Sequence, residues 1–389
     1  MDPLGRTLRV VARRLTPALA SAETVARLAR LVDDLPDAPR ALLERRLGGT
    51  ATGLDISLCT LPPLRRKAPG IEAAAPGEAT NSADPRARRI AAWLDRSAPA
   101  SASRALSALH RAWEDPESVA SASVGRAWIE VDTTQVDANG VSPAALFLGL
   151  RAGARPLRDV APYLPVDSAP VLESALFQRV LGSLPECARV TFLGAWAGRE
   201  VPCLRVNVAG LPDGGLVDYL LGLGWRGPTG DLASLVAEIV RCGASPILCF
   251  DIGPPEPSGR IAAPDDVSVR GRVSVEAMLD DAPLDGSAWR PLLDAFLEHK
   301  LCTTAETEAI LGWGGISDPA ADAWPMEMIL DALLRGPSQT PVIFRHVNHL
   351  KIVVEPGAPP LAKAYLAFGT LAANVTRRAR DVRGEDLPG

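Results

Sequence analysis

Lysine is scarce in this chain, and so are the features that would mark a secreted or membrane-bound protein. Only four of its 41 basic residues are lysines. No run of about 18 or more apolar residues occurs, so no segment is long enough to form a membrane-spanning helix. Arginines interrupt the N-terminal stretch "LRVVARRLTPALA", which makes it a poor signal peptide. These absences predict a cytoplasmic protein.

A strong net charge and closely spaced cysteines are also missing. The formal charge is −5 over 389 residues, which argues against nucleic acid or an anionic membrane as the main partner. An anionic ligand would therefore need a local concentration of basic groups. The six cysteines form no CxxC pair and several lie in apolar runs, which favours buried free thiols over disulfides or a metal site. The Ala, Pro and Arg bias is typical of a GC-rich, bacterial genome.

Helical and strand periodicities alternate along the chain. Helical spacing over 22–35 precedes a second, short predicted helix over about 37–47 and the strand "GLDISLCT" at 53–60. The stretch 60–85 has no period and is rich in Pro, Ala and Gly, which predicts a mobile loop open to limited proteolysis. Residues 378–389 are expected to form a C-terminal tail.

Four further rounds of helices and strands follow. Their predicted bounds are helices 86–96 and 102–113 before strands 126–133 and 145–151; helix 169–184 before strands 189–196 and 201–210; helices 214–224 and 231–242 before strands 246–253 and 267–277; and helices 289–301, 304–312 and 324–335 before a hairpin at 348–368. Strands that arrive in adjacent pairs imply antiparallel hairpins, and the intervening helices must cover one face of the sheet.

Closure of these strands would remove both edges of the sheet. The pattern therefore predicts an α+β fold, with a ten-stranded antiparallel barrel of five ααββ repeats inside an outer ring of helices, as a single domain over residues 1–389. Apolar positions such as Ile129, Val206 and Leu350 are expected under the helices.

Polar side chains occupy the strand face that would line such a barrel. In the segment 267–276 the valines share one face, and Ser268, Arg270, Arg272, Ser274 and Glu276 share the other. The polar-face positions of all strands are Asp55, Trp128, Glu130, Asp132, Arg151, Arg205, Asn207, Asp251, Arg270, Arg272, Glu276, His349, Lys351, Lys363 and Tyr365. The barrel interior is therefore expected to be wet and charged.

Two of the four lysines flank one short turn, "EPGAPP", at similar distances. Lys351 and Lys363 should then be cross-strand neighbours, and like charges in that position destabilise a sheet. An anion should lie between them, either a carboxylate such as Glu276 or a polyanionic ligand such as a phosphate. Tyr365 in the same row can donate a hydrogen bond. The alternative is a solvated basic face that is balanced by nearby acids.

A metal site at "HVNH" is disfavoured by the same periodicity. Residues three apart on a strand point to opposite faces, so His346 and His349 should not share an ion. No GxSxG, HExxH, Walker or Rossmann pattern occurs in a fitting context.

The order of elements resembles the ABBA-barrel aromatic prenyltransferases, which include the indole and cyanobactin prenyltransferases. "KAY" at 363–365 is similar to the K-x-Y pairs of that family, and "HLK" at 349–351 and "RGR" at 270–272 are similar in kind. The resemblance implies that an allylic diphosphate is held by Arg205, Arg270, Arg272, His349, Lys351, Lys363 and Tyr365. It implies Glu130, with Asp132 or Asp55 as substitutes, as the acid that orients or deprotonates the acceptor, and Trp128 and Tyr365 as the carbocation shield.

The resemblance predicts an enzyme that moves a dimethylallyl or longer allylic group from its diphosphate to an aromatic or peptide side-chain acceptor in natural-product biosynthesis. Fixed cations need little help from a metal, so no cofactor is required, although Mg²⁺ is compatible with this chemistry. The family shields its carbocation with several tyrosines, whereas this chain has only Tyr365 on a strand, with Tyr163 predicted in a loop and Tyr219 in a helix. The alternative is a non-catalytic barrel that binds a peptide or small molecule as a partner protein in such a pathway.

Overall fold

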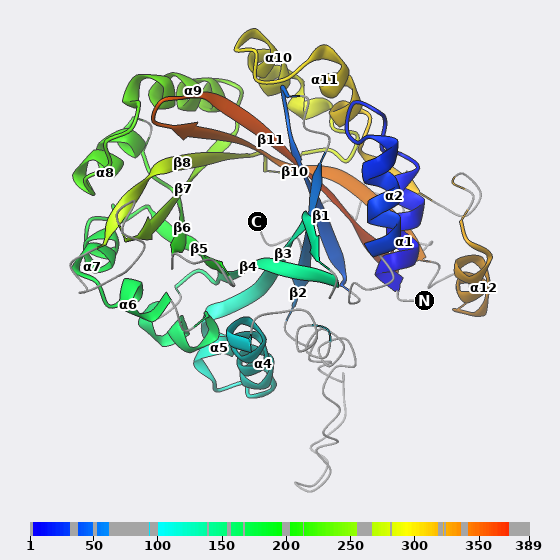
Figure 1. The fold of residues 1–389 in the computed structure, drawn as a ribbon, viewed down its shortest axis with the longest axis horizontal. Coiled ribbons are helices and arrows are strands. Elements are labelled where there is room, and N and C mark those ends of the chain that lie inside the picture. The colour runs from blue at the N-terminus through cyan, green and yellow to red at the C-terminus, as the bar shows by residue number, and fades with distance from the viewer. Residues whose placement is uncertain are drawn as a thin grey trace, which may run out of the picture.

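Ten strands pair in sequence, each antiparallel to its neighbours, and the last returns to the first (Figure 1). Their bounds are β1 Arg40–Arg46, β2 Leu54–Thr60, β3 Val124–Asp137, β4 Gly140–Leu150, β5 Arg189–Trp196, β6 Leu204–Ala209, β7 Ser245–Gly253, β8 Ser268–Met278, β10 Pro341–Glu355 and β11 Ala358–Ala372. The β11–β1 pairing closes the barrel, and the short strand β9 (Gly315–Ser317) adds to one end of β10. The predicted α+β fold with a closed ten-stranded barrel is confirmed.

The protein is described by a computed structural model over residues 3–31, 38–49, 53–61, 93, 100–137, 140–153, 157–165, 168–196, 203–212, 214–254, 267–280, 282–317, 322, 324–335 and 341–372. The loop predicted at 60–85, beyond Leu61, and the tail predicted at 378–389 lie outside the described residues.

Helices lie around the outside of the barrel (Figure 1). Those with described bounds are α1 Pro3–Ala12, α2 Ala22–Leu31, α4 Ala100–Glu114, α5 Val119–Ser123, α6 Ala169–Leu172, α7 Ala175–Gly182, α8 Gly215–Gly222, α9 Thr229–Arg241, α10 Arg290–Glu298, α11 Thr304–Leu311 and α12 Met326–Arg335, with the 3-10 turns η1 Leu157–Tyr163 and η3 Ser287–Trp289. None of these helices combines the length and the apolarity that crossing a membrane takes.

The main hydrophobic core lies between the helices and the outer face of the sheet. Ile129, Val206 and Leu350 are at most 2% exposed and belong to this core, as predicted. Buried tryptophans join the two layers: the indole N–H of Trp113 donates to the carbonyl of Val124 at 3.0 Å. Burial of large aromatic side chains with their N–H groups satisfied is a major source of stability.

The helix predicted over 37–47 is wrong, because this segment is strand β1. Its Leu, Arg and Glu content gives it a good intrinsic helix propensity, yet its backbone pairs with β2 on one side and β11 on the other. Ala41 and Leu43 are fully buried in the main core, whereas Leu42 belongs to a separate cluster inside the barrel. This alternation is the period of a strand, and the long-range pairing outweighs the local preference.

Two helical predictions need smaller corrections. The helix predicted over 169–184 is interrupted before Ser174, whose hydroxyl accepts a hydrogen bond from the Phe177 N–H and begins α7. Tyr163, predicted in a loop, ends the turn η1. Tyr219 lies in α8, as predicted.

A β-bulge in β10 overturns the predicted orientation of the two histidines. His346 pairs with Ala367 and His349 pairs with Tyr365, and the register shifts between Val347 and His349. Ala367 and Tyr365 are two residues apart, so they share one face of β11. His346 and His349 therefore share the inner face of β10, because the extra residue in the bulge reverses the alternation.

Candidate functional site

The two lysines that flank the hairpin turn are direct cross-strand partners. Lys351 on β10 pairs with Lys363 on β11, and the turn between the strands contains Gly357 at a φ of 75°. The predicted juxtaposition is therefore confirmed, and both side chains lie on the inner face of the barrel with Tyr365.

Each lysine has its own carboxylate. The Lys351 ammonium donates to Glu276 Oε1 at 3.1 Å, and the Lys363 ammonium donates to Glu44. Burial alone would raise the pKa of each glutamate, but the attraction of its lysine and the hydrogen bonds outweigh burial and lower both pKa values to about 2. Protein carboxylates thus neutralise the like-charge pair, which was one of the two outcomes expected from the sequence.

Tyr365 and His349 are the neighbouring cross-strand pair on β11 and β10, two residues from the lysine pair. Their rings stack with centroids 3.9 Å apart, and the Tyr365 hydroxyl bonds to Glu44. Burial lowers the pKa of His349 to about 4, since the nearby Glu276 only partly offsets it. The imidazole is therefore neutral at neutral pH. Its Nδ1 lies 3.1 Å from Asn348 Oδ1, which can only accept, so the proton is on Nδ1 and Nε2 is an acceptor. Nε2 is buried and has no hydrogen-bond partner among the described residues, so His349 offers a ligand a neutral acceptor rather than the positive charge that the sequence suggested.

Arg205 is fixed on the opposite part of the wall by Asp251. Two hydrogen bonds of 2.8 and 3.0 Å join the guanidinium to the carboxylate, and the guanidinium also lies 4.5 Å from the Trp196 ring centroid. Burial opposes the charged form, but the attraction of Asp251 outweighs it and raises the pKa of Arg205. This geometry is a bidentate pair stacked on an aromatic face, which holds an arginine in one orientation.

Glu130 differs from the other lumenal acids. It is half-buried on β3 between Ser57 and Ala145 of the neighbouring strands, and it makes no hydrogen bond or ion pair with any residue that the structure describes. Burial raises its pKa, the charge of Glu44 adds to the rise, and Lys363, Arg205 and Lys351 oppose it. A carboxylate with open lone pairs and a raised pKa is suited to accept a proton or an N–H hydrogen bond.

Of the two proposed substitutes for Glu130, only Asp55 has a described side chain. Asp55 accepts a hydrogen bond from the backbone N–H of Thr133 at 3.3 Å, which ties it to the neighbouring strand. Asp132 lies in β3, but its side chain is outside the described residues.

An apolar cluster lies inside the barrel, separate from the main core. It contains Leu42, Cys59, Trp128, Tyr365 and Ala367, with the half-buried rings of Phe147 and Phe192 packed against it. The two residues expected to shield a carbocation, Trp128 and Tyr365, therefore meet in one cluster. Phe147 and Phe192 were not predicted, although each alternates with apolar residues that face the helices.

The "RGR" motif lies toward the start of β8, before Glu276. Arg270 and Arg272 lie in an irregular part of β8, where the register shifts between Val269 and Val273. Arg272 is four residues and Arg270 is six residues from Glu276, at most about 13 and 20 Å along the strand. Arg270 contacts the Cys203 sulfur at 3.3 Å, and Pro356 of the hairpin turn packs beside Gly271. These arginines therefore lie near one end of the barrel.

Three further charged residues of the lumen were missed. Glu44 and Arg40 are on β1, which was misread as a helix, and the alternation of "RALLERR" is the signal that could have found them. Arg126 precedes Trp128 by two residues on β3, so the same alternation extends to it. All three take part in the interactions of the inner wall.

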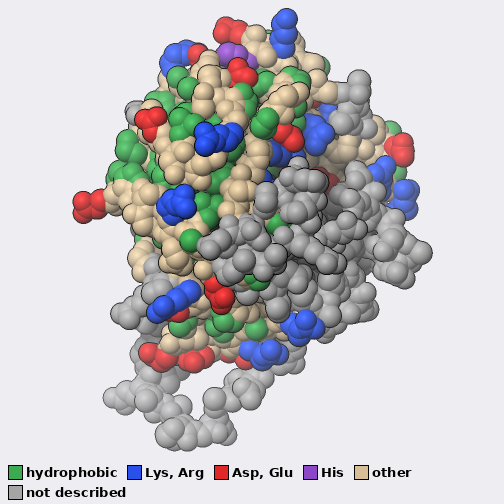
Figure 2. Space-filling view, turned by 60° about the vertical axis from the view of Figure 1, so that its left-hand side comes forward, with side chains coloured by type: hydrophobic (Ala, Val, Ile, Leu, Met, Phe, Trp, Pro, Cys, Tyr) green, Lys and Arg blue, Asp and Glu red, His purple; other side chains and the backbone are tan. Residues whose placement is uncertain are grey.

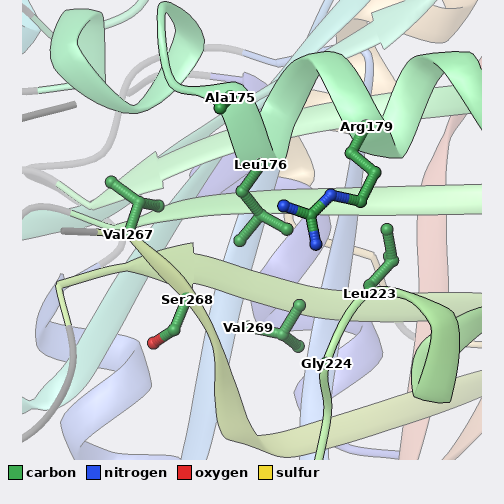
Figure 3. A pocket seen from close by; sticks show the side chains of 8 residues that line it. All are labelled: Ala175, Leu176, Arg179, Leu223, Gly224, Val267, Ser268 and Val269. Atoms are coloured by element: carbon green, nitrogen blue, oxygen red, sulfur yellow. The ribbon is translucent and has the colours of Figure 1, made fainter. Parts of the chain in front are cut away.

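A cavity of about 320 Å³ lies elsewhere, on the helix side of the sheet. Figure 3 shows Arg179 of α7 reaching between Leu176 and Leu223 toward the start of β8. The residues that line this cavity are mainly apolar and include none of the predicted site residues. In the view of Figure 2, acidic and basic side chains are scattered and form no single-sign patch on that face. Within the described ranges, no group of three or more His, Cys, Asp or Glu side chains is arranged to hold a metal ion.

Comparison with known proteins places the fold. No protein-family model and no curated protein matches the chain. The prenyltransferase PriB in its apo form matches with a TM-score of 0.52 and 14% identity, over 94% of this chain and 96% of that chain. 5-Dimethylallyltryptophan synthase from Streptomyces coelicolor matches with a TM-score of 0.50 and 15% identity, over 93% and 95%. A ternary complex of PriB with L-tryptophan and dimethylallyl thiolodiphosphate matches with a TM-score of 0.52 and 14% identity, over 93% and 96%.

These likenesses confirm the predicted resemblance at the level of the fold. The chain has the barrel of the aromatic prenyltransferases over nearly its full length. A shared fold does not define a function, which depends on the residues of the site.

Proposed function

We propose that this protein is a prenyltransferase, which moves an allylic group from its diphosphate to an electron-rich acceptor inside the barrel. The observation that carries this proposal is the carboxylate of Glu130, which has no hydrogen-bond or ion-pair partner among the described residues, in a lumen that also holds cationic groups and an aromatic cluster. The fold shared with prenyltransferases adds support.

In this reaction the bond between the allylic carbon and the diphosphate oxygen breaks, and pyrophosphate leaves with the electron pair. The rings of Trp128 and Tyr365 would face the allylic cation and stabilise it through their π-electrons. The acceptor then donates an electron pair to the allylic carbon to form the new bond. Glu130 would orient the acceptor and take the proton that the acceptor loses.

Arg205, Lys351, Lys363 and Tyr365 would contribute to holding the diphosphate. An ammonium has three N–H donors, so Lys351 can keep its bond to Glu276 and still donate to a phosphate oxygen. His349 would line the diphosphate site without donating to it, because its only N–H faces Asn348 Oδ1, and Arg270 and Arg272 would attract the anion from near one end of the barrel. This assignment needs no metal, and transfer should therefore survive addition of EDTA.

The acceptor proposed is an aromatic ring or a peptide side chain, as in a natural-product pathway. PriB has been captured with L-tryptophan and a dimethylallyl thiolodiphosphate, and for this chain an indole is the first acceptor to test. Incubation with dimethylallyl diphosphate and a panel of indoles, phenols and peptides, followed by mass spectrometry, would detect transfer.

The variant Glu130→Gln separates the chemical role of Glu130 from binding. It should keep diphosphate binding and reduce the turnover number by about 10²- to 10⁴-fold, because a general base is lost without a change in size. Asp251→Asn is a matched control for the removal of a lumenal carboxylate charge, and it should disturb Arg205 and diphosphate binding instead. Unchanged turnover in Glu130→Gln would remove Glu130 from the mechanism.

The pairing of each lysine with a glutamate specifically favours a second candidate function. In a non-catalytic barrel these pairs would be a structural network, and the lumen would bind a peptide or small molecule. Pyrophosphate would then leave the melting temperature of the wild-type protein unchanged, whereas the transferase should be stabilised by mass action.

A further inference from the structure

Two arginines lie on the inner wall away from the lysine pair. Arg40 on β1 pairs with Cys59 on β2, and Cys59 pairs with Trp128 on β3. Arg126 lies two residues before Trp128, on the same face of β3. Because β1, β2 and β3 are adjacent, this register places Arg40 and Arg126 at the same end of the lumen.

Arg40 makes its contact with a neutral group. One of its terminal nitrogens lies 2.9 Å from Nε2 of His346. A guanidinium only donates, so Nε2 accepts and the imidazole proton is on Nδ1. Burial and the charge of Arg40 lower the pKa of His346 to about 3, which keeps the ring neutral.

This contact leaves two buried donors without acceptors. The Nε atom of Arg40 and the Nδ1 atom of His346 are both buried, and neither has a hydrogen-bond partner in the part of the chain that the structure describes. A buried donor without an acceptor costs free energy, so an oxygen-bearing group placed here would be stabilised.

The charges that act on Arg40 are also unbalanced. They come from Cys59 and Arg126. Burial raises the pKa of the Cys59 thiol to about 11, so this thiol is uncharged at neutral pH. Arg40 therefore faces another cation, which lowers its pKa further. Lys351 and Lys363, in contrast, each face a glutamate.

Aromatic rings border the same place. The Arg126 guanidinium lies 5.1 Å from the Phe192 ring centroid, and the Phe344 ring stacks on His346 with centroids 5.7 Å apart. Leu42, Cys59 and Trp128 continue this wall into the apolar cluster. The surroundings suit an anion that is attached to an apolar or aromatic body.

We propose that Arg40, Arg126 and His346 form an oxyanion-binding subsite of the lumen, which takes a phosphate or carboxylate group of a substrate. This inference rests on the proposed function in that the lumen is the substrate site. The oxyanion has two possible sources, the diphosphate of the donor or a carboxylate of the acceptor, and both would bridge the two guanidinium groups through charge-assisted hydrogen bonds.

Calorimetric titration of the full-length protein tests the subsite with two probes, inorganic pyrophosphate and indole-3-acetate. Arg40→Met and Arg126→Met remove the charges and keep much of the apolar volume. Arg290→Met is the matched control, because Arg290 lies on the surface of α10 with Glu308 as its partner. Thermal unfolding of each variant without ligand verifies that it folds.

We expect both lumenal variants to weaken binding of at least one probe by about ten- to a hundredfold, while Arg290→Met leaves it unchanged. Loss of pyrophosphate binding assigns the subsite to the donor, and loss of indole-3-acetate binding assigns it to the acceptor. The subsite proposal is overturned if the folded variants Arg40→Met and Arg126→Met bind both probes with wild-type affinity. It is also overturned if the wild-type protein binds neither probe.

Transfer assays keep this inference distinct from the proposed function. If the wild type transfers an allylic group but the arginine variants bind both probes normally, only the subsite fails. If the arginines control anion binding but no acceptor is alkylated, the subsite stands and the transferase proposal fails.

Discussion

The two basic regions of the barrel lumen are built on opposite principles. Lys351 and Lys363 are partners across two strands, and each is neutralised by a glutamate. Arg40 and Arg126 lie on one end of the wall, and Arg40 is paired with a neutral histidine. The charges of the lysine region are balanced without a ligand. The arginine region keeps two buried donors, Arg40 Nε and His346 Nδ1, without acceptors among the described residues.

This difference shows two ways in which buried basic side chains are accommodated inside a closed barrel. In a buried ion pair, each charge compensates the other. Removal of one partner therefore lowers the free energy of unfolding strongly, because the remaining charge is buried and unpaired. Two neighbouring cations repel each other, which lowers the stability of the unliganded protein. An anion that binds between them relieves this repulsion, so its binding is favoured. The lysine region should therefore dominate the stability of the unliganded protein, and the arginine region should respond most to ligands.

The largest effect on stability is expected from Lys351→Met. This change leaves Glu276 buried without its cation, and breaking a buried pair by removing one partner costs about 3–5 kcal/mol. The free energy of unfolding from urea titration measures the loss. Equal stability of Lys351→Met and wild type would show that the ion pair does not hold the barrel together.

Acid should weaken the protein over a defined pH range. The folded-state pKa values of Glu44 and Glu276 are about 2, below the ordinary value of 4.5. The unfolded chain therefore binds their protons first, and their contribution is full above pH 4.5 and is lost as the pH falls toward 2. Each group contributes on the order of 3 kcal/mol.

His346 and His349 add to this loss at higher pH. Their folded pKa values, about 3 and about 4, lie below the ordinary value of 6.5, so their contribution starts to fall below pH 6.5. Urea midpoints measured from pH 7 to pH 3 should decline throughout. A flat profile from pH 6.5 to pH 4.5 would show that these imidazoles take up protons in the folded barrel.

The smallest effect is expected at the arginine end. Arg40→Met should change the free energy of unfolding of the unliganded protein by less than about 1 kcal/mol, with a gain as the expected sign, because it relieves repulsion by Arg126. The same urea titration detects it. A loss as large as that of Lys351→Met would mean that both regions are structural and would erase the contrast between them.

Much of this arrangement follows from local sequence patterns. Alternation along the strands identified the inner-face positions on the six strands that bear the predicted site, apart from His346 on β10. The symmetric spacing about "EPGAPP" placed Lys351 opposite Lys363. These features depend on the two-residue period of a strand and on a short turn, both of which are local.

The remaining features depend on contacts that are distant in sequence. "RALLERR" becomes a strand because β11 closes the barrel on it, and this hid Arg40 and Glu44. The bulge beside Asn348 reverses the alternation of β10 and moves His346 to the inner face. The choice between a glutamate and a ligand as the lysines' anion required the positions of strands far apart in the chain.

Calorimetric titration of the wild-type protein with dimethylallyl thiolodiphosphate, an unreactive donor analogue, tests the central claim most directly. The account predicts saturable binding that weakens as salt is added, because the lumen's cations supply the attraction. It also predicts that Glu130→Gln binds the analogue as well as the wild type does. Absence of binding at millimolar analogue would contradict the claim and leave the barrel as a binding scaffold for another class of ligand.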